Sequence, residues 1–314
     1  MRLSAPGRSL RAGLGAVENG TPSPSERGKT MATLGINSFN MSFASTLIGT
    51  TSADSIYGFG GNDVLWGGFG NDYMSGGSGD DQLYAGDGTW NYNYWGNDTA
   101  LGGDGNDWIN FYYTLSDVKL YGDQASYADA VALGTYADGR DTIYGGWGND
   151  EIVGGGGNDT IYGGAGRDMI AGDYWQQNSP GFNGSDIIVG GQGNDYIVTG
   201  GGDDTIVINN GDSYAWYGGG GMDTIVDFNS IHDKIDLPGQ VYSWNYIEAY
   251  MSNGGWDNAV TMANSYLKTC DYVFLTDRTN GYLFADTNGD TYADIGVLLA
   301  GQTSLNDFSY YNII

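Results

Sequence analysis

A nine-residue pattern recurs from Gly49 to Val226 and constrains the fold of this chain more than any other feature. Its full copies read Gly-Gly-x-Gly-x-Asp-x-U-x, where U is a large apolar residue, and they occupy 67–75, 76–84, 102–110, 145–153, 154–162, 163–171 and 190–198. Much of the glycine in the chain, 56 of 314 residues, belongs to this pattern. A short fixed period predicts a repeat architecture in which each unit packs against its neighbours.

The two parts of the repeat predict different local structures. Its glycines and aspartate suit a turn with positive-φ positions, and the x-U-x end alternates like a short strand. A three-residue strand cannot bury its apolar residue alone, so successive units must coil and stack their U side chains between layers. We therefore predict an all-β fold, a right-handed parallel β-roll with about 18 residues per coil.

The sixth position of the repeat is an aspartate, and this choice predicts a metal requirement. The chain has 11 Lys and Arg against 38 Asp and Glu, a net charge of -27, which disfavours nucleic acid and anionic membranes as partners. Two carboxylates about 5 Å apart on adjacent layers repel by roughly 3 kcal/mol at an effective dielectric near 20. Carboxylates and glycine carbonyls suit the flexible oxygen coordination of Ca²⁺ better than the octahedral geometry of Mg²⁺.

The spacing of these aspartates predicts which layers pair. Some gaps between them exceed nine residues, and we count these gaps as degenerate units that stay in the coil. Counting then gives an asymmetric roll with about eight calcium ions. One edge pairs Asp63/Asp81, Asp81/Asp98, Asp150/Asp168, Asp168/Asp186, Asp186/Asp204 and Asp204/Asp223, and the other pairs Asp54/Asp72 and Asp141/Asp159. Asp107 and Asp195 have no place in these pairs.

The repeat resembles the calcium-binding nonapeptide of RTX (hemolysin-type) proteins. The segments DFNSIHDKIDL (227–237) and YLFADTNGDTYADIGVLLAGQTSLNDF (282–308) resemble the carboxy-terminal end of serralysin-type metalloproteases. The resemblance implies export by the type I secretion apparatus, an uncleaved terminal signal, an extracellular location and folding on calcium outside the cell. The H-E-x-x-H motif of those proteases is absent, so no such catalysis is expected.

Composition changes divide the chain into four expected parts. Residues 1–30 read as a disordered leader, with Met31 as a possible start of translation, and 31–48 as an amino-terminal cap. The roll is expected over 49–226 and the serralysin-like segment over 227–314. Within that segment, we expect one or two short helices over residues 244–275. The sequence contains no run of 18 consecutive apolar residues, so no transmembrane helix is expected.

Two further sites are hypotheses. Oxygens at alternate positions in DTNGDTYAD predict one more calcium ion, bound by Asp286, Asn288, Asp290 and Asp294. Aromatic residues in the degenerate units predict a polysaccharide or cell-surface contact, at Trp90, Trp95, Tyr174, Trp175 and Trp216; the alternative is that these rings pack against the roll.

Three functions remain open. The first is a non-enzymatic adhesive, matrix or surface component that folds on calcium. The second is a polysaccharide-binding module, and the third a membrane-active protein, although no hydrophobic segment precedes the repeats. Catalysis is not expected: Gly211, Asp212 and Ser213 lie in repeat register, and the chain has one histidine, His232, and one cysteine, Cys270, both expected to be structural.

Overall fold

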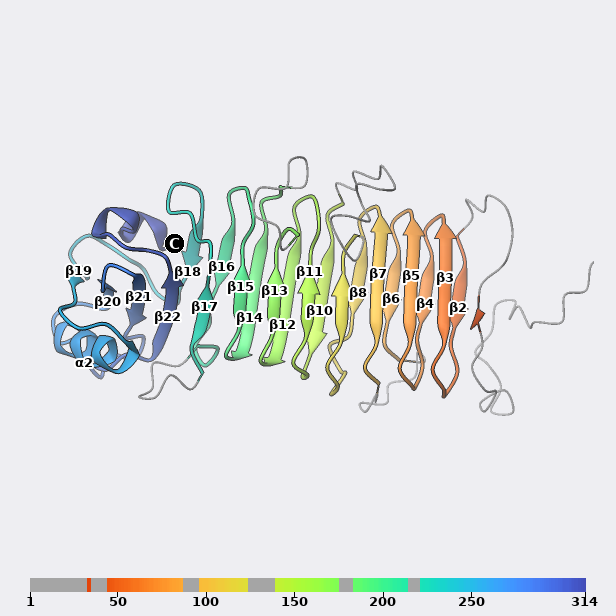
Figure 1. Ribbon diagram of the computed structural model, residues 1–314, viewed down its shortest axis with the longest axis horizontal. Coiled ribbons are helices and arrows are strands. Elements are labelled where there is room, and N and C mark those ends of the chain that lie inside the picture. The colour runs from red at the N-terminus through yellow and green to blue at the C-terminus, as the bar shows by residue number, and fades with distance from the viewer. Residues whose placement is uncertain (1–32, 35–43, 87–95, 124–138, 175–182, 214–220) are drawn as a thin grey trace, which may run out of the picture.

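The computed structural model describes residues 33–34, 44–86, 96–123, 139–174, 183–213 and 221–314. Through these residues the chain alternates between two parallel sheets that lie face to face along a long axis (Figure 1). Sheet A contains β1 (Thr33–Leu34), β3 (Ser55–Gly60), β5 (Tyr73–Ser78), β7 (Thr99–Asp104), β9 (Lys119–Tyr121), β11 (Glu151–Val153), β13 (Met169–Ala171), β15 (Tyr196–Val198) and β17 (Asp223–Ile225). Sheet B contains β2 (Thr46–Ile48), β4 (Val64–Trp66), β6 (Gln82–Tyr84), β8 (Trp108–Asn110), β10 (Thr142–Gly146), β12 (Thr160–Gly166), β14 (Ile187–Gly193), β16 (Thr205–Val207) and β18 (Lys234–Asp236). The predicted parallel β-roll is confirmed.

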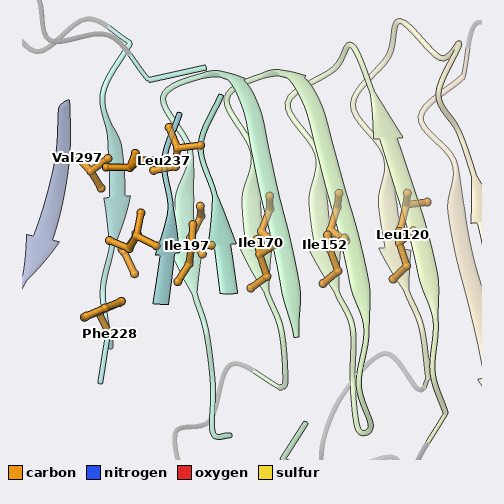
Figure 2. Close-up of a cluster of buried hydrophobic side chains, with 14 of the residues drawn as sticks. Leu120, Ile152, Ile170, Ile197, Phe228, Leu237 and Val297 are labelled. Atoms are coloured by element: carbon orange, nitrogen blue, oxygen red, sulfur yellow. The ribbon is translucent and has the colours of Figure 1, made fainter. Parts of the chain in front are cut away.

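The core is a double file of apolar side chains, one from each strand. The middle residue of each x-U-x strand points inward and pairs in register with the same position one layer on, as Ile143 does with Ile161 and Ile161 with Ile188. Figure 2 shows Leu120, Ile152, Ile170 and Ile197 in one such file. These side chains are fully buried, so each layer depends on its neighbours for its core.

Replacing Ile170 by alanine should destabilise the roll by about 2 to 5 kcal/mol, because the two flanking layers hold the cavity open. The matched control is Met169→Ala, since the neighbouring Met169 points outward and is 49% exposed. Urea unfolding in millimolar calcium measures both variants. Equal loss of stability in the two would contradict the inward and outward assignment.

The glycines of the turns are required by the distance between layers. Gly70 has a φ of +122°, and a Cβ on it would lie 2.6 Å from the backbone carbon of Ser52 in the adjacent layer. Such a contact is too short for any side chain, and the positive φ itself favours glycine. The fourth repeat position is therefore fixed by two independent constraints.

The carboxy-terminal segment continues sheet A instead of forming a separate layer. β22 (Ile295–Ala300) pairs in parallel with β17, and β21 (Asn280–Ala285) and β20 (Tyr272–Thr276) follow in antiparallel order. β19 (Tyr246–Tyr250) forms the last edge of the sheet, and α2 (Trp256–Tyr266) packs Ala259, Val260 and Ala263 against β20 and β21. Two short 3₁₀ helices follow, η1 (Leu305–Asp307) and η2 (Tyr310–Asn312).

Parallel pairing extends beyond the expected limits of the roll at both ends. β2 lies within the expected cap and pairs with β4, and β18 lies after residue 226 and pairs with β16. The last residues also join sheet B, because the Ile314 amide donates to the Ile235 carbonyl at 3.0 Å and Ile313 is buried beside it. Residues 227–236 therefore belong to the layered structure.

Candidate metal sites

Two rows of buried aspartates run along the roll, one at the start of each sheet's strands. In each row the backbone amide of one aspartate donates to Oδ1 of the aspartate in the next layer, for example Asp63 to Asp81 at 2.7 Å and Asp168 to Asp195 at 2.9 Å. The row before sheet B contains Asp63, Asp81, Asp107, Asp141, Asp159, Asp186, Asp204 and Asp233. The row before sheet A contains Asp54, Asp72, Asp98, Asp150, Asp168, Asp195 and Asp223, with Val118 in the layer between Asp98 and Asp150.

The rows confirm part of the predicted pairing and correct the rest. The pairs Asp54/Asp72, Asp63/Asp81, Asp141/Asp159, Asp150/Asp168 and Asp186/Asp204 are neighbours as predicted. The pairs Asp81/Asp98, Asp168/Asp186 and Asp204/Asp223 are wrong, because their partners lie in opposite rows.

The physical reason for this error lies in the long gaps. Each of these three gaps spans a single half-turn, from β6 to β7, from β13 to β14 and from β16 to β17. The extra residues add chain length without adding a described strand. The predicted asymmetry between the edges is therefore also wrong, and Asp107 and Asp195 occupy full places in the rows.

Most aspartates of the rows turn their second oxygen, Oδ2, toward a glycine of the same turn. Within the described residues, Oδ2 has no hydrogen-bond partner in Asp63, Asp72, Asp81, Asp107, Asp141, Asp150, Asp159, Asp168, Asp186, Asp195 and Asp204. A Cβ built on Gly163 would lie 2.6 Å from Oδ2 of Asp168 and 2.5 Å from the carbonyl oxygen of Gly190 in the next layer. The repeat therefore forms a cradle, a small space bounded by a carboxylate oxygen, a glycine α-carbon and a carbonyl from the adjacent layer.

These cradles fit a hard divalent cation. Ca²⁺ binds oxygen ligands at 2.3–2.6 Å and tolerates irregular geometry, and buried carboxylate oxygens without a partner are costly unless a cation or proton neutralises them. No three Asp, Glu, His or Cys side chains converge on one point within the described part of the chain. Backbone carbonyls such as that of Gly190 would therefore have to complete the coordination sphere around each Asp oxygen.

Burial raises the pKa of these carboxyl groups. The pKa of Asp72 is raised to about 8 and that of Asp168 to about 7, mainly because burial removes water from the charged form. Asp159 has a pKa well above its usual value for the same reason, reinforced by the neighbouring charges of Asp141 and Asp186. Without a cation, the folded roll would hold protons that the unfolded chain releases.

In the presence of a chelator, acidification should restore β-structure. The folded-state pKa values lie above the unfolded value of 3.8, so the folded chain binds more protons, and its stability is present at low pH and lost as pH rises through about 7 to 8. Circular dichroism in chelator at pH 8 and pH 5.5 should show more β-structure at the lower pH. In calcium the order should reverse, because protons then compete with the ion. Unchanged spectra in chelator would contradict the assignment.

The 286–294 turn is held together by its own backbone amides. Asp286 accepts from the amides of Gly289 and Thr291 at 2.7 and 2.8 Å, and Asp294 accepts from the amide and hydroxyl of Thr287. Asn288 and Asp290 accept from the amides two residues further on. The four side chains do lie in one turn, and calcium binding there stays a prediction.

The predicted aromatic contact falls mostly outside the described residues. Trp90, Trp95, Trp175 and Trp216 are not among them. Tyr174 is buried against Ala171 and Val198 on the outer side of sheet A, so the prediction that it presents an exposed ring is wrong. It matches the alternative, in which the ring packs against the roll.

The remaining candidate residues have structural surroundings. The Ser213 hydroxyl is buried and donates to the Gly296 carbonyl at 2.7 Å while accepting from the Asp223 amide. His232 contacts Asp203 at 2.7 Å on the surface. Cys270 is buried beside α2, and burial raises the pKa of its thiol to about 11.

Two aspartates outside the predicted set, Asp123 and Asp173, lie directly before segments of extra residues in the roll. In a regular layer the third-position amide donates to the second-position carbonyl of the adjacent layer, as Phe69 does to Thr50 at 2.9 Å. Where extra residues follow, an aspartate occupies the second position and its carboxylate accepts instead: Gly156 donates to Asp123 at 2.6 Å, and Gly201 to Asp173 at 2.7 Å.

A sequence signal for these aspartates exists. Gly-Asp precedes each long gap, at 86–87, 122–123, 172–173 and 211–212, and Gly-x-Asp ends it, at 96–98, 139–141, 184–186 and 221–223. Asp233, the last member of its row, could have been found from the D-x-U-x pattern of 233–236 without any glycine.

Comparison with known proteins identifies the repeat. The family described as RTX calcium-binding nonapeptide repeat (4 copies) matches residues 42–74, 61–89, 92–110, 137–161, 144–173 and 180–214. No match was found among curated proteins. No helix in the described part of the chain is long and apolar enough to cross a membrane.

Among solved structures, the chain is similar to two subunits of mannuronan C5-epimerase from Azotobacter vinelandii. AlgE6R3 is 20% identical, with a TM-score of 0.27 and coverage of 68% of this chain and 80% of that one. AlgE6R2 is 22% identical, with a TM-score of 0.31 and coverage of 56% and 87%. It is also similar to the extracellular lipase LipA from Serratia marcescens, at 14% identity and a TM-score of 0.28, covering 93% of this chain and 43% of the lipase.

Proposed function

We propose that this chain, which carries RTX calcium-binding nonapeptide repeats, is an extracellular, non-enzymatic protein that folds when calcium binds between the layers of its roll. The observation that carries the proposal is the set of buried aspartates whose Oδ2 faces a neighbouring carbonyl across a glycine cradle. When bound, calcium supplies the positive charge that lets carboxylates of adjacent layers approach. The chain itself supplies the oxygens and, through its glycines, the space.

The proposed place of folding is outside the cell. At sub-micromolar calcium the carboxylates would stay charged and solvated, and the chain would remain extended and exportable. In the folded chain Phe308, Asn312 and Ile313 are buried, so a signal in these terminal residues would be accessible only before folding. This order supports the proposed export by a type I secretion apparatus, followed by folding in millimolar calcium.

The proposed role is adhesive or structural. The aspartates that the roll places in regular order are engaged between layers, where they hold adjacent turns together. A rod of stacked layers presents a long, regular surface, and this geometry suits a matrix or cell-surface component.

Adjacent aspartates in one turn provide the test. Asp81 lies in the buried row, whereas Asp80 is exposed and bonds to Asn106. Asp81→Asn should lower the number of calcium ions bound, or their affinity, and raise the calcium concentration needed for folding. Asp80→Asn changes the net charge equally and should leave both unchanged.

Equilibrium dialysis with radioactive calcium and circular dichroism, followed over the same titration, measure binding and folding together. Coincident transitions support the proposal. Binding without folding, or equal effects of the two substitutions, would sink it.

A further inference from the structure

The outer face of sheet B forms a continuous stripe of side chains that nothing above explains. The stripe consists of the first and third residues of the seven x-U-x strand segments from β4 to β16: Val64, Trp66, Gln82, Tyr84, Trp108, Asn110, Thr142, Tyr144, Thr160, Tyr162, Ile187, Val189, Thr205 and Val207. These strands pair in register, so the side chains form two parallel files along the axis of the roll.

The stripe carries no charged residue, although the protein has a net charge of -27. The next strand of sheet B, β18, carries the charged residues Lys234 and Asp236 at the same two positions. An uncharged surface of this length on so acidic a protein offers no attraction to a polyanion. An uncharged ligand that covers it buries no carboxylate, and so avoids the cost of desolvating a charge.

The opposite face of the roll is covered along one of its two files of side chains, from β9 to β15. On the outer side of sheet A, the third strand residues Tyr121, Val153, Ala171 and Val198 are buried and form a cluster with Tyr174. No residue of the stripe is buried to that degree, and Trp108 is 38% exposed. The outer side of sheet A also exposes Met169 and Tyr196, but there the charged pair Lys119 and Glu151 interrupts the surface, whereas the stripe on sheet B is uncharged throughout.

The dimensions of the stripe fit one polymer chain better than a protein. Seven strands at about 4.8 Å give a length of about 29 Å, and two strand residues give a width of about 7 Å. The resulting area, about 200 Å², is far below the roughly 800 Å² per partner of a stable protein interface. A narrow, straight, periodic surface suits a linear ligand lying along the axis.

The chemistry of the stripe suits sugar rings. Tyr, Trp and Thr present apolar surface beside hydroxyl and N–H groups, and a pyranose likewise has apolar C–H faces edged by hydroxyls. Two aromatic pairs are stacked on each other, Trp66 with Tyr84 at 4.2 Å and Tyr144 with Tyr162 at 4.7 Å between ring centroids. One face of each ring is thus taken up within its pair, and the Tyr84 hydroxyl donates to Oε1 of Gln82 at 3.0 Å.

Trp108 lies between these pairs and differs from them. It is tilted by 49° to Tyr144 at 5.3 Å and is the most exposed ring of the stripe. Its neighbour along the strand on the same face is Asn110, whose amide can donate and accept hydrogen bonds. Trp108 therefore provides the ring against which a sugar can stack.

We propose that the sheet B stripe binds a single chain of a linear, uncharged polysaccharide, with Trp108 as its central contact. This surface is distinct from the calcium cradles, which lie in the turns, and none of the aromatic residues of the long gaps belongs to the strands that form it. Calcium is needed only because it holds the sheet together.

Affinity gel electrophoresis in millimolar calcium, with hydroxyethylcellulose in the gel, tests the proposal. The unmodified protein should be retarded, and Trp108→Ala should weaken binding by about tenfold or more, as loss of a central aromatic contact does. Thr160→Glu, which adds a charge to the stripe while keeping every ring, should also weaken it. Alginate, a polyanion, should cause no retardation.

Trp147→Ala is the matched control, because Trp147 is 62% exposed but lies on the turn after β10, outside the stripe. Circular dichroism confirms that each variant folds in calcium, so a failure of calcium-dependent folding is seen separately. Absence of retardation of a folded protein, equal retardation of Trp108→Ala, or stronger retardation by alginate would overturn the proposal. So would a dimer in sedimentation velocity that Trp108→Ala dissociates, because the stripe would then join two copies of the chain.

Discussion

Removing divalent ions from the folded protein should abolish its cooperative thermal unfolding. Each pair of adjacent carboxylates would then contribute roughly 3 kcal/mol of repulsion at about 5 Å, and the two rows contain many such pairs. Their sum exceeds the 5 to 15 kcal/mol that typically stabilises a domain. We expect the circular dichroism of the chelated protein at pH 7.5 to lose its β-sheet character, and calorimetry to show no transition.

Adding back ions distinguishes coordination from screening. Calcium in excess of the chelator should restore the transition, whereas magnesium should restore much less, because it prefers octahedral geometry and retains its waters. High sodium chloride screens exposed charges but reaches buried pairs poorly. If the chelated protein still unfolds cooperatively at neutral pH, repulsion between carboxylates of adjacent layers is not large enough to unfold the roll, and the prediction is wrong.

Replacing Gly163 by alanine should fill one cradle. The φ of Gly163 is not in the left-handed region, so alanine adds no backbone strain, but its methyl carbon would lie 2.5 to 2.6 Å from the Gly190 carbonyl and from Oδ2 of Asp168. We expect the loss of one calcium ion and a destabilisation of about 1 to 3 kcal/mol from overpacking alone. Equilibrium dialysis and urea unfolding in calcium measure the two effects.

Arg167→Ala is the control for this substitution. Arg167 lies in the same turn, its side chain is exposed, and its backbone amide keeps the bond to Asn149 in the variant. Its calcium stoichiometry should be that of the unmodified protein. If Gly163→Ala also retains every ion, the cradle is not the binding site.

The repeat predicted the layers because its period fixes both turn and strand. Gly at the fourth position and an apolar residue at the eighth suffice to place Gly70 in a positive-φ turn and Met74 in the core. These are local constraints, so they can be read from nine residues at a time.

The rows could be predicted only where the period was unbroken. Register passes from one layer to the next through backbone pairing, and the extra residues between Asp168 and Asp186 add no strand within the described part of the chain. Counting residues through such a gap therefore assigns the wrong row. The carboxy-terminal packing was beyond reach for a related reason, since the Ile235 contact with Ile313 joins positions far apart in sequence.

The Gly-Asp and Gly-x-Asp sequences that bracket each gap have a consequence for engineering. Asp173 bonds both to Gly201 in the adjacent layer and to Gly184 at the far end of its gap, at 2.7 and 3.1 Å, which ties the two ends of the intervening peptide together. The length of that peptide is thereby uncoupled from strand pairing. A foreign epitope grafted between Asp173 and Gly184 would be displayed at a defined position along the rod, without shifting any downstream turn.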